Sequence, residues 1–283
     1  MLDPLEVVLD LAGRALASPL VLHRDRSWPH GESTVLEVRD AAGTPWIVKQ
    51  ARDPAAFARE ARALRDWAPL LGDGLAPRLR ATVAERSLLV QDRLPGRAGT
   101  AATAGEFRQA GRLVARLHAA EPAVPDPDYA ARCSDNLDRW LHRVPGVIDA
   151  ADLGFVRARL ALVGSMPAAV SGPMHNDNQP RNWLTDAAGT VRLIDFGKAK
   201  RDVQLRDFER MRSAEWRERP DLRDGFFDGY GRTLTDAEEQ MLACVGAYAA
   251  TTAILWARAH GDEGFEEHGR RTLADLRALD TAT

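Results

Sequence analysis

The hydrophobic pattern of the chain changes at Pro95-Gly96, and this change limits the possible folds more than any other feature. Before it, two apolar runs in "STVLEVRDAAGTPWIVKQ" flank the turn residues Asp40-Ala-Ala-Gly43, which is typical of a β-hairpin. A further short strand is expected from Ser87 to Val90. After it, "EFRQAGRLVARLHAAEP" and "LDRWLHRVPGVI" repeat apolar residues at helical spacing. The pattern predicts an α+β chain with a small β-rich N-terminal lobe and a larger, mostly helical C-terminal lobe.

A proline-glycine pair after a strand suits a linker, so we place the boundary between the lobes at this break. The N-terminal lobe is predicted to span residues 1–93 and the C-terminal lobe residues 94–283. A chain of 283 residues exceeds the usual size of a single core. Its composition, 45% apolar and 28% charged, is that of an ordinary globular protein.

A helix is expected directly after the first hairpin, and it carries a carboxylate on its inward side. Asp53-Pro54 supplies an N-cap and a first-turn proline, and Phe57, Ala61 and Leu64 recur at helical spacing. Glu60 lies between Phe57 and Ala61 on this stripe. A carboxylate that is buried there requires a cation.

The charge of the chain favours a small substrate. With 41 acidic and 38 basic residues, the formal charge of −3 gives no reason to expect nucleic acid or an anionic membrane surface as the main partner. The charge is uneven, because residues 202–283 hold 17 acidic and 11 basic residues and so carry −6. This region could attract a cation.

Cysteine usage and the N-terminus favour a cytoplasmic protein. Cys133 and Cys244 are far apart in sequence and form no CxxC pair, which argues against a disulfide framework or a zinc knuckle. The N-terminal stretch carries Asp3, Glu6 and Asp10 where a signal peptide needs a basic start and an unbroken apolar run. We expect no run long enough to span a bilayer.

Residues 174–200, "MHNDNQPRNWLTDAAGTVRLIDFGKAK", place many oxygen ligands around one short hairpin. If the turn is centred on Ala188-Gly189, then Asn182 directly faces Asp195 on the opposite strand. Directly opposed residues have Cβ atoms about 4.5 to 5.5 Å apart, so both side chains could reach one cation. An amide and a carboxylate are hard oxygen ligands, which favours Mg²⁺.

Asp177 precedes this expected metal site by five residues, on the loop that leads into the first strand. A carboxylate near Mg²⁺ and phosphate can accept the proton of an attacking hydroxyl and hold that hydroxyl in line. This is the positional role that phosphoryl transfer needs from a protein.

The motif His175-x-Asp177-x-x-x-x-Asn182, followed by Asp195-Phe196-Gly197, resembles the catalytic loop and metal-binding triplet of the aminoglycoside phosphotransferase and choline kinase group. The resemblance implies a two-lobed, protein-kinase-like fold. It also implies that Asp177 is the catalytic base, that His175 braces the loop, and that Asn182 and Asp195 hold Mg²⁺. The reaction would move the γ-phosphoryl group of ATP or GTP to a hydroxyl of a small molecule.

Other segments match the same group in the expected order. Lys49, at the end of a strand, is similar to the lysine that contacts the α- and β-phosphates, and Glu60 is similar to its helix partner. The segment "LVQDRLPG" is similar to the hinge whose backbone receives adenine or guanine, which assigns nucleotide binding to Asp92, Arg93 and Leu94.

Two departures separate the chain from protein kinases. It lacks G-x-G-x-x-G, and the candidate phosphate loop "SWPHGESTV" has one glycine, Gly31, with hydroxyls at Ser33 and Thr34. It also has no Ala-Pro-Glu after the Asp-Phe-Gly triplet. A protein substrate is therefore less expected than a small molecule.

The acceptor and the class of function stay open at this point. An aminoglycoside or related antibiotic is the first hypothesis, and choline, ethanolamine, another amino alcohol or a sugar is the second. A nucleotide-binding regulatory module without turnover is a third, although the complete set of Lys49, Asp177, Asn182 and Asp195 argues against it. A metal-dependent hydrolase would need further His or Asp clusters. Arg181 could contact phosphate, but a solvated side chain is the simpler interpretation.

Overall fold

The structure is a computed structural model that describes residues 4–28, 31, 33–167 and 169–281. The chain forms two compact units. The first contains residues 1–121, 173–200 and 221–231, and the second contains residues 122–172, 201–220 and 232–283. Both units are formed from segments that are distant in the sequence. The lobe boundary at residues 93 and 94 stays a prediction.

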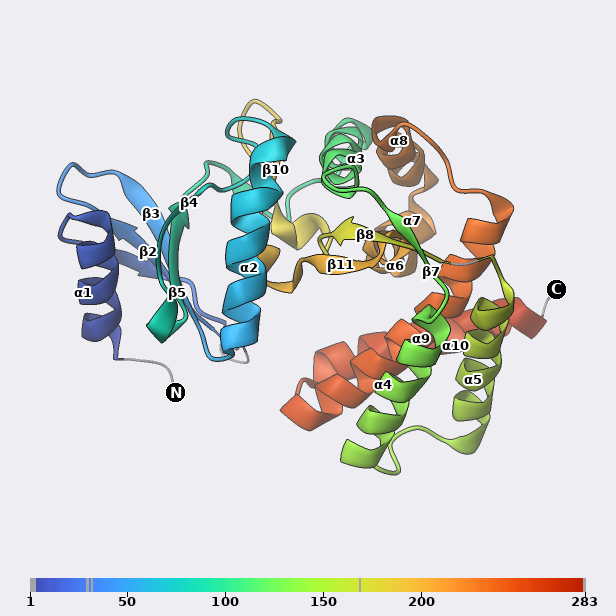
Figure 1. Ribbon diagram of the computed structural model, residues 1–283. Helices are drawn as coiled ribbons and strands as arrows, with labels where there is room; N and C mark the ends of the chain where they lie inside the picture. The colour runs from blue at the N-terminus through green and yellow to red at the C-terminus, as the bar shows by residue number, and fades with distance from the viewer. Residues whose placement is uncertain (1–3, 29–30, 32, 168, 282–283) are drawn as a thin grey trace. The chain divides into compact units, whose positions relative to one another are not determined.

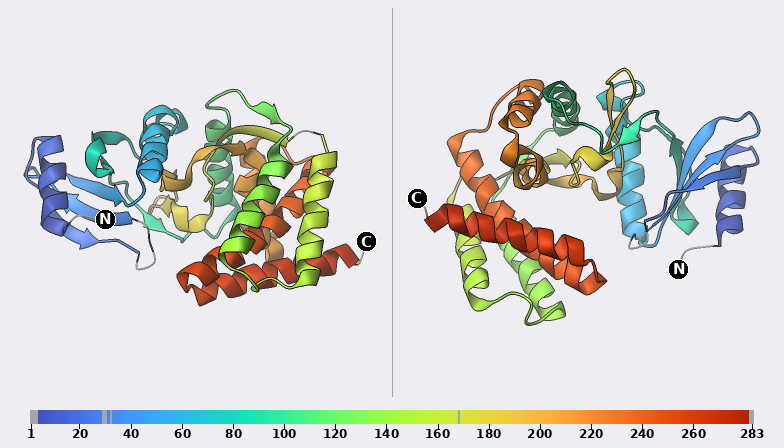
Figure 2. Two further views of the ribbon diagram at one scale, coloured as in Figure 1. Left: turned by 60° about the horizontal axis from the view of Figure 1, so that its bottom comes forward. Right: turned by 180° about the vertical axis from the view of Figure 1, so that it is seen from behind.

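The first unit contains an antiparallel sheet with one helix on each face (Figure 1, Figure 2). Its strands, in the order β1-β2-β3-β5-β4, are β1 (Val21–Asp25), β2 (Ser33–Arg39), β3 (Pro45–Ala51), β5 (Leu88–Asp92) and β4 (Leu79–Val83). The predicted hairpin is β2 and β3, which pair from Ser33 and Ala51 to Arg39 and Pro45. The strand predicted at Ser87 to Val90 is β5, which extends to Asp92.

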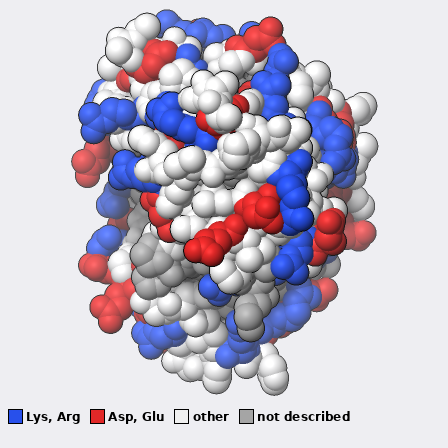
Figure 3. Space-filling view, turned by 90° about the vertical axis from the view of Figure 1, so that its left-hand side faces the viewer, with Lys and Arg blue, Asp and Glu red and all other residues white. Residues whose placement is uncertain are grey.

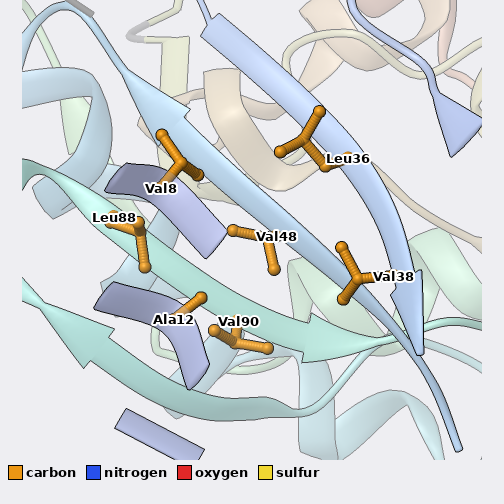
Figure 4. Close-up of a cluster of buried hydrophobic side chains, with 7 residues drawn as sticks. All are labelled: Val8, Ala12, Leu36, Val38, Val48, Leu88 and Val90. Atoms are coloured by element: carbon orange, nitrogen blue, oxygen red, sulfur yellow. The ribbon is translucent and has the colours of Figure 1, made fainter. Parts of the chain in front are cut away.

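Helix α1 (Leu5–Leu16) covers one face of this sheet. Its apolar side chains pack on those that alternate along the strands, as Figure 4 shows. The cluster is fully buried and consists of Val8, Ala12, Leu36, Val38, Val48, Leu88 and Val90. The intervening residues of the strands therefore face the other side, where α2 lies.

Helix α2 (Pro54–Asp66) begins as the sequence predicts. The Asp53 carboxylate accepts hydrogen bonds from the amides of Ala55 and Ala56, and Pro54 occupies the first turn. Phe57, Ala61 and Leu64 are buried on the predicted stripe, and Glu60 is only 2% exposed among them. The expected buried carboxylate is therefore present.

The register predicted for the polar hairpin is wrong by one residue. Strand β9 (Trp183–Thr185) pairs with β10 (Val191–Leu193) so that Trp183 opposes Leu193. The Asp186 amide donates to the Thr190 carbonyl, which leaves a three-residue turn in place of the expected two. Asn182 consequently lies opposite Ile194, whose amide donates to the Asn182 carbonyl at 2.9 Å.

Asp186 explains the longer turn. Its carboxylate accepts hydrogen bonds from the amides of Ala188 and Thr190, and Gly189 adopts a positive φ of 77°. A three-residue hairpin turn ends with a residue in this left-handed conformation, which suits glycine. The short strand β6 (Arg97–Ala98) pairs with β9 on the side away from β10.

Two further helices of the first unit, α3 (Ala104–His118) and α8 (Pro220–Tyr230), approach each other at glycines. A Cβ added at Gly111 would overlap the Phe226 carbonyl oxygen, and one added at Gly229 would overlap the Arg108 carbonyl oxygen. Gly225 is equally close to Ala104. The backbones of the two helices are therefore in direct contact.

We expect Gly229→Ala to lower the free energy of unfolding by about 3 kcal/mol, because the added methyl group forces two rigid helices apart. Gly154→Ala is the matched control on helix α5 (Ala150–Ser165), since nothing lies within 4 Å of its added Cβ. That change should stabilise the protein slightly, as alanine does in an open helix position. Urea unfolding of both variants measures the difference, and equal stabilities would contradict the close contact.

The second unit is mostly helical. Helices α4 (Tyr129–Arg143), α5, α9 (Asp236–His260) and α10 (Glu263–Thr281) lie side by side in it (Figure 2). Strands β7 (Val124–Asp126) and β8 (Ala169–Met174) pair antiparallel, with β11 (Lys200–Val203) on the other side of β8. Two short helices, α6 (Glu209–Ser213) and α7 (Glu215–Glu218), complete it. Cys133 and Cys244 are both buried.

Helix α9 corrects one expectation from the sequence. By length and composition it could cross a membrane, with 25 residues and a mean hydropathy of 1.3 in its most apolar window. However, 67% of that window is buried within the protein. The apolar character of α9 is that of a core helix in a globular unit.

Candidate active site

Lys49 joins two carboxylates that are far apart in the sequence. Its Nζ lies 2.8 Å from Glu60 Oε2 on α2 and 2.9 Å from Asp195 Oδ1, just after β10. The Lys49 and Glu60 side chains are only 12% and 2% exposed. The cation that the buried Glu60 requires is therefore Lys49, and the structure brings all three predicted residues together.

Lys49 stabilises the ionised form of both carboxylates, and both carboxylates stabilise its ammonium group. Burial disfavours the Lys49 ammonium, but Glu60 and Asp195 outweigh this effect and raise its pKa above the usual value. The same ammonium lowers the pKa of Asp195. Burial raises the pKa of Glu60, and Lys49 opposes that rise. Because the Asp195 side chain is 48% exposed, its ionised carboxylate still offers an open surface to a ligand.

The backbone around Asp195 is shaped for this contact. Asp195 has a positive φ of 63°, a conformation that few residues other than glycine adopt. A Cβ at Gly197 would lie 3.0 Å from Lys49 Nζ and 3.3 Å from Asp195 Oδ1. A glycine at this position leaves the room that the ion pairs need.

His175 connects the loop that follows β8 to the segment before Asp195. It is fully buried, and its Nε2 lies 2.9 Å from the Ile194 carbonyl oxygen. Its ring meets that of Phe196 edge to face, with centroids 5.1 Å apart. These contacts suit a brace for the loop, the role that the resemblance implies.

Asp177 is buried and receives several hydrogen bonds. Its carboxylate accepts from Gln179 Nε2 at 2.6 Å, from Arg181 Nη2 at 3.0 Å and from Asn182 Nδ2 at 3.0 Å. Asn182 Nδ2 also donates to the Asp177 carbonyl oxygen at 2.8 Å. The Asn182 amide nitrogen is therefore directed at Asp177, and its amide oxygen is the atom suited to a metal.

The donor set fits Mg²⁺. Asp195 supplies an ionised, half-exposed carboxylate and Asn182 a neutral oxygen, and Mg²⁺ commonly takes one or two such protein ligands together with water and phosphate. Across residues 4–28, 31, 33–167 and 169–281, no group of three His, Cys, Asp or Glu side chains could hold a metal ion. A three-ligand protein site of the kind used by zinc hydrolases is not found among these residues.

The residues predicted to bind the phosphates are only partly described. Ser33 is the first residue of β2 and shares a sheet face with Val35, which opposes Lys49 on β3. Pro29, His30 and Glu32 of the candidate phosphate loop lie outside the described residues. Ser33 is therefore on the same face as Lys49.

A model of the phosphotransferase enzyme family matches residues 28–244. The chain belongs to this family. This phosphotransferase is therefore a kinase that acts on a hydroxyl group of a small molecule. A comparison with curated proteins finds no match.

Solved structures of similar phosphotransferases show the same fold. A macrolide 2'-phosphotransferase from Brachybacterium faecium is 22% identical, with a TM-score of 0.67 over 95% of this chain and 97% of that chain. A thermostable mutant of the aminoglycoside phosphotransferase APH(4)-Ia is 15% identical, with a TM-score of 0.73 over 98% and 100%. The streptomycin–ATP complex of the phosphotransferase APH(2")-IIa is 13% identical, with a TM-score of 0.68 over 97% of both chains. The predicted two-lobed, protein-kinase-like α+β fold is confirmed.

The segment predicted to be the hinge is fixed by hydrogen bonds at Asp92, the first of its three residues assigned to nucleotide binding. The Asp92 carboxylate pairs with Arg80 Nε at 2.5 Å, and the Asp92 amide donates to the Arg78 carbonyl at 3.1 Å. Within the described part of the chain, the amides of Arg93 and Leu94 donate no hydrogen bond. Of the three predicted residues, these two therefore keep backbone donors available.

Two polar residues on the Lys49 face of the sheet were missed from the sequence. Glu37 on β2 and Gln91 on β5 both pair with Ile47 of β3, so they lie in one row across the sheet. Burial acts to raise the pKa of Glu37, but a hydrogen bond from Arg26 and the charge of Arg93 lower it overall. Counting alternate residues along β2 from Val35 would have found Glu37, whereas Gln91 follows only from the register of β5 against β3.

Gln91 stands out because it is unsatisfied. It is 7% exposed, and its Oε1 is buried without a hydrogen-bond partner among the described residues. A buried amide in this state costs stability unless a further group, such as an ordered water or a ligand, completes its hydrogen bonds. Gln91 immediately precedes the hinge, so it is a candidate contact for the nucleotide base.

Proposed function

We propose that this phosphotransferase binds ATP or GTP with Mg²⁺ and transfers the γ-phosphoryl group directly to a hydroxyl of a small molecule. The observation that carries the proposal is the simultaneous contact of Lys49 with Glu60 and Asp195. The contact supports the proposal because it brings a lysine that is suited to phosphate next to a half-exposed carboxylate that is suited to a metal, on a fold of this family.

The residues divide the chemistry among them. Asp177 accepts the proton of the acceptor hydroxyl. At the same time the hydroxyl oxygen bonds to the γ-phosphorus, and the bond between the γ-phosphorus and the oxygen that bridges it to the β-phosphate breaks. Lys49 holds the α- and β-phosphates, and Asn182 and Asp195 hold Mg²⁺. The metal, when bound, neutralises charge on the phosphates. His175 keeps the loop in place. Direct in-line transfer needs no covalent enzyme intermediate.

The donor base is assigned to the hinge. The amides of Arg93 and Leu94, which make no hydrogen bond within the described residues, are suited to the edge of a purine. The related phosphotransferase solved with streptomycin and ATP supports a nucleoside triphosphate as donor. Ser33 would lie near the phosphates, since it shares the face of Lys49.

We expect Gln91→Met to raise the free energy of unfolding by about 1 kcal/mol, because it removes a buried, unsatisfied amide. The same change should weaken purine nucleotide binding about threefold or more and alter the ratio of ATP to GTP affinity, since the base loses a hydrogen-bond partner. Thermal melts and calorimetric titrations measure both effects.

Gln50→Met is the matched control for this change. Gln50 is also buried on the sheet, at 2% exposure, but its Nε2 donates to the Arg86 carbonyl at 3.1 Å. Replacing it should destabilise the protein and leave base selection unchanged. If Gln91→Met is as destabilising as Gln50→Met, then Gln91 is an ordinary structural residue.

For the acceptor we propose an aminoglycoside or a related hydroxylated antibiotic such as a macrolide. Support comes from the charge of −6 in residues 202–283 and from the similar macrolide and aminoglycoside phosphotransferases. Choline, ethanolamine, another amino alcohol or a sugar is the second candidate. The regulatory-module alternative loses support because Lys49, Asp177, Asn182 and Asp195 all lie in one unit.

We place the protein in the cytoplasm, acting without nucleic acid or a membrane as partner. On the face that Figure 3 shows, acidic and basic side chains are interspersed among the described residues, and neither sign forms a continuous field. A broad basic surface would be needed to hold nucleic acid or anionic lipid.

Mass spectrometry of reaction products tests the proposal. The protein is incubated with Mg²⁺, with ATP or GTP, and with aminoglycosides, macrolides, choline, ethanolamine or sugars. We expect one class of compound to gain a phosphoryl group, and the Asp177→Asn variant to produce none of this product. Nucleotide binding without any phosphorylated product would instead favour the regulatory module.

A further inference from the structure

The carboxylate of Asp177 has no acceptor site left for a substrate hydroxyl. Gln179 donates to Oδ1, Asn182 donates to Oδ2, and Arg181 Nη2 donates to both, at 3.3 and 3.0 Å. Two carboxylate oxygens offer about four lone-pair sites. A base in this state must release one donor before it can receive the proton of a hydroxyl.

Arg181 is the donor that can leave. The Asn182 side chain is buried and also holds the Asp177 carbonyl oxygen at 2.8 Å, so its position is fixed by two bonds. The Arg181 side chain is 56% exposed, whereas that of Asp177 is 6% exposed, so the pair faces water on the guanidinium side only. Arg181 is also the most exposed of the three donors, because Gln179 is partly buried and Asn182 is buried. Releasing the guanidinium requires only rotation of its side chain.

Neighbouring backbone contacts fix the Arg181 Cα, although the Arg181 side chain is exposed to solvent. Pro180 opens the short 3₁₀ turn Pro180–Asn182, and the Pro180 carbonyl accepts the amide of Gly99 at 2.9 Å. A Cβ at Gly99 would lie 3.9 Å from Arg181 Cα, so β6 and its following turn are packed against this position. The guanidinium therefore moves about a fixed Cα.

The γ-phosphate is within reach of that movement. In the proposed reaction the acceptor oxygen lies about 3 Å from Asp177 and about 3 to 3.5 Å from the γ-phosphorus. A guanidinium that starts on the Asp177 carboxylate is therefore only a few ångströms from the γ-phosphate oxygens. Its planar set of donors matches phosphate as well as it matches a carboxylate.

We propose that Arg181 binds the γ-phosphate of the donor nucleotide and, in moving there, releases Asp177 for the acceptor hydroxyl. This inference rests on the proposed phosphotransferase function and adds a phosphate-binding residue to it. Arg181 thereby makes the base available only when a transferable phosphoryl group is present.

Calorimetric titration with two nucleotides tests the proposal. The wild-type protein, Arg181→Gln and Arg181→Lys are titrated, with Mg²⁺, with a diphosphate and with its non-hydrolysable β,γ-imido triphosphate, in adenine and guanine forms. We expect Arg181→Gln to weaken triphosphate binding about tenfold or more while diphosphate binding stays within about twofold. Arg181→Lys should recover part of the loss, because it keeps the charge.

Arg14→Gln is the control. Arg14 pairs with Asp10 four residues away, at 2.6 Å, and both side chains are exposed, as in many surface ion pairs. The Arg14→Gln variant should bind the diphosphate and the triphosphate with unchanged affinity. If Arg181→Gln weakens the binding of both nucleotides equally, or of neither, then Arg181 is only a structural partner of Asp177. This result overturns the inference about Arg181 and leaves the proposed phosphotransferase function standing. A wild-type protein that binds neither nucleotide overturns the proposed function as well.

Discussion

Asp177→Asn lowers the rate of phosphoryl transfer by about 10²- to 10⁴-fold, the range that a positioned general base contributes. The amide has nearly the shape of the carboxylate, but it cannot take the proton of the acceptor hydroxyl. Nucleotide affinity should stay close to that of the wild type, since Lys49 and Asp195 are unchanged. Turnover is measured by product formation and nucleotide affinity by calorimetry.

Asp10→Asn provides the control for this variant, because Asp10 is an exposed acid on α1 that pairs only with Arg14 among the described contacts. It should retain full activity. Turnover in Asp177→Asn at the level of Asp10→Asn would remove Asp177 from the role of base.

Asp195→Asn is expected to weaken nucleotide binding in the presence of Mg²⁺ by about 100-fold, because a neutral amide is a much poorer ligand for this cation than a carboxylate. The affinity that remains should no longer depend on Mg²⁺ concentration. Titrations of nucleotide at several Mg²⁺ concentrations, with and without a chelator, measure this dependence.

The variant should still fold. The Lys49 to Glu60 ion pair, at 2.8 Å, is independent of Asp195 and neutralises the buried Glu60 carboxylate. A thermal melt separates loss of metal binding from loss of structure. An unchanged Mg²⁺ dependence in a folded Asp195→Asn protein would show that the metal is held elsewhere.

Local sequence signals were sufficient to predict those features that one or two neighbouring residues determine, such as a helix start or a turn. Asp53 and Pro54 start α2, and the spacing of Phe57 and Ala61 places Glu60 on the buried stripe. The turn at Gly43, which has a positive φ of 82°, separates β2 from β3 as expected. These features depend on neighbours within a few positions.

Local sequence signals did not predict the register of the polar hairpin formed by β9 and β10. The length of its turn depends on the hydrogen bonds of the Asp186 side chain, and a change of one residue moves every side chain to the other face. Asn182 and Asp195 both lie just outside the paired segments, in a 3₁₀ turn and in left-handed backbone. Their positions follow from the loops, which strand pairing does not predict.

Tertiary contacts explain the remaining differences. The direct approach of α3 and α8 at Gly111 and Gly229 depends on segments more than 100 residues apart. The pairing of Arg181 with Asp177 is local, because the two residues are only four positions apart, but it depends on the short 3₁₀ turn that also holds Asn182. These contacts become visible only once the chain is folded.

The contact between Lys49 and Asp195 has a consequence for control of the enzyme. Lys49 pairs with both Glu60 and Asp195 in this structure, and many kinases must assemble ion pairs of this kind before they can work. We therefore expect activity without a covalent modification, and we expect the position of the Arg181 side chain to depend on the donor nucleotide. We expect the pace of the reaction in the cell to follow the amount of enzyme and the supply of its two substrates.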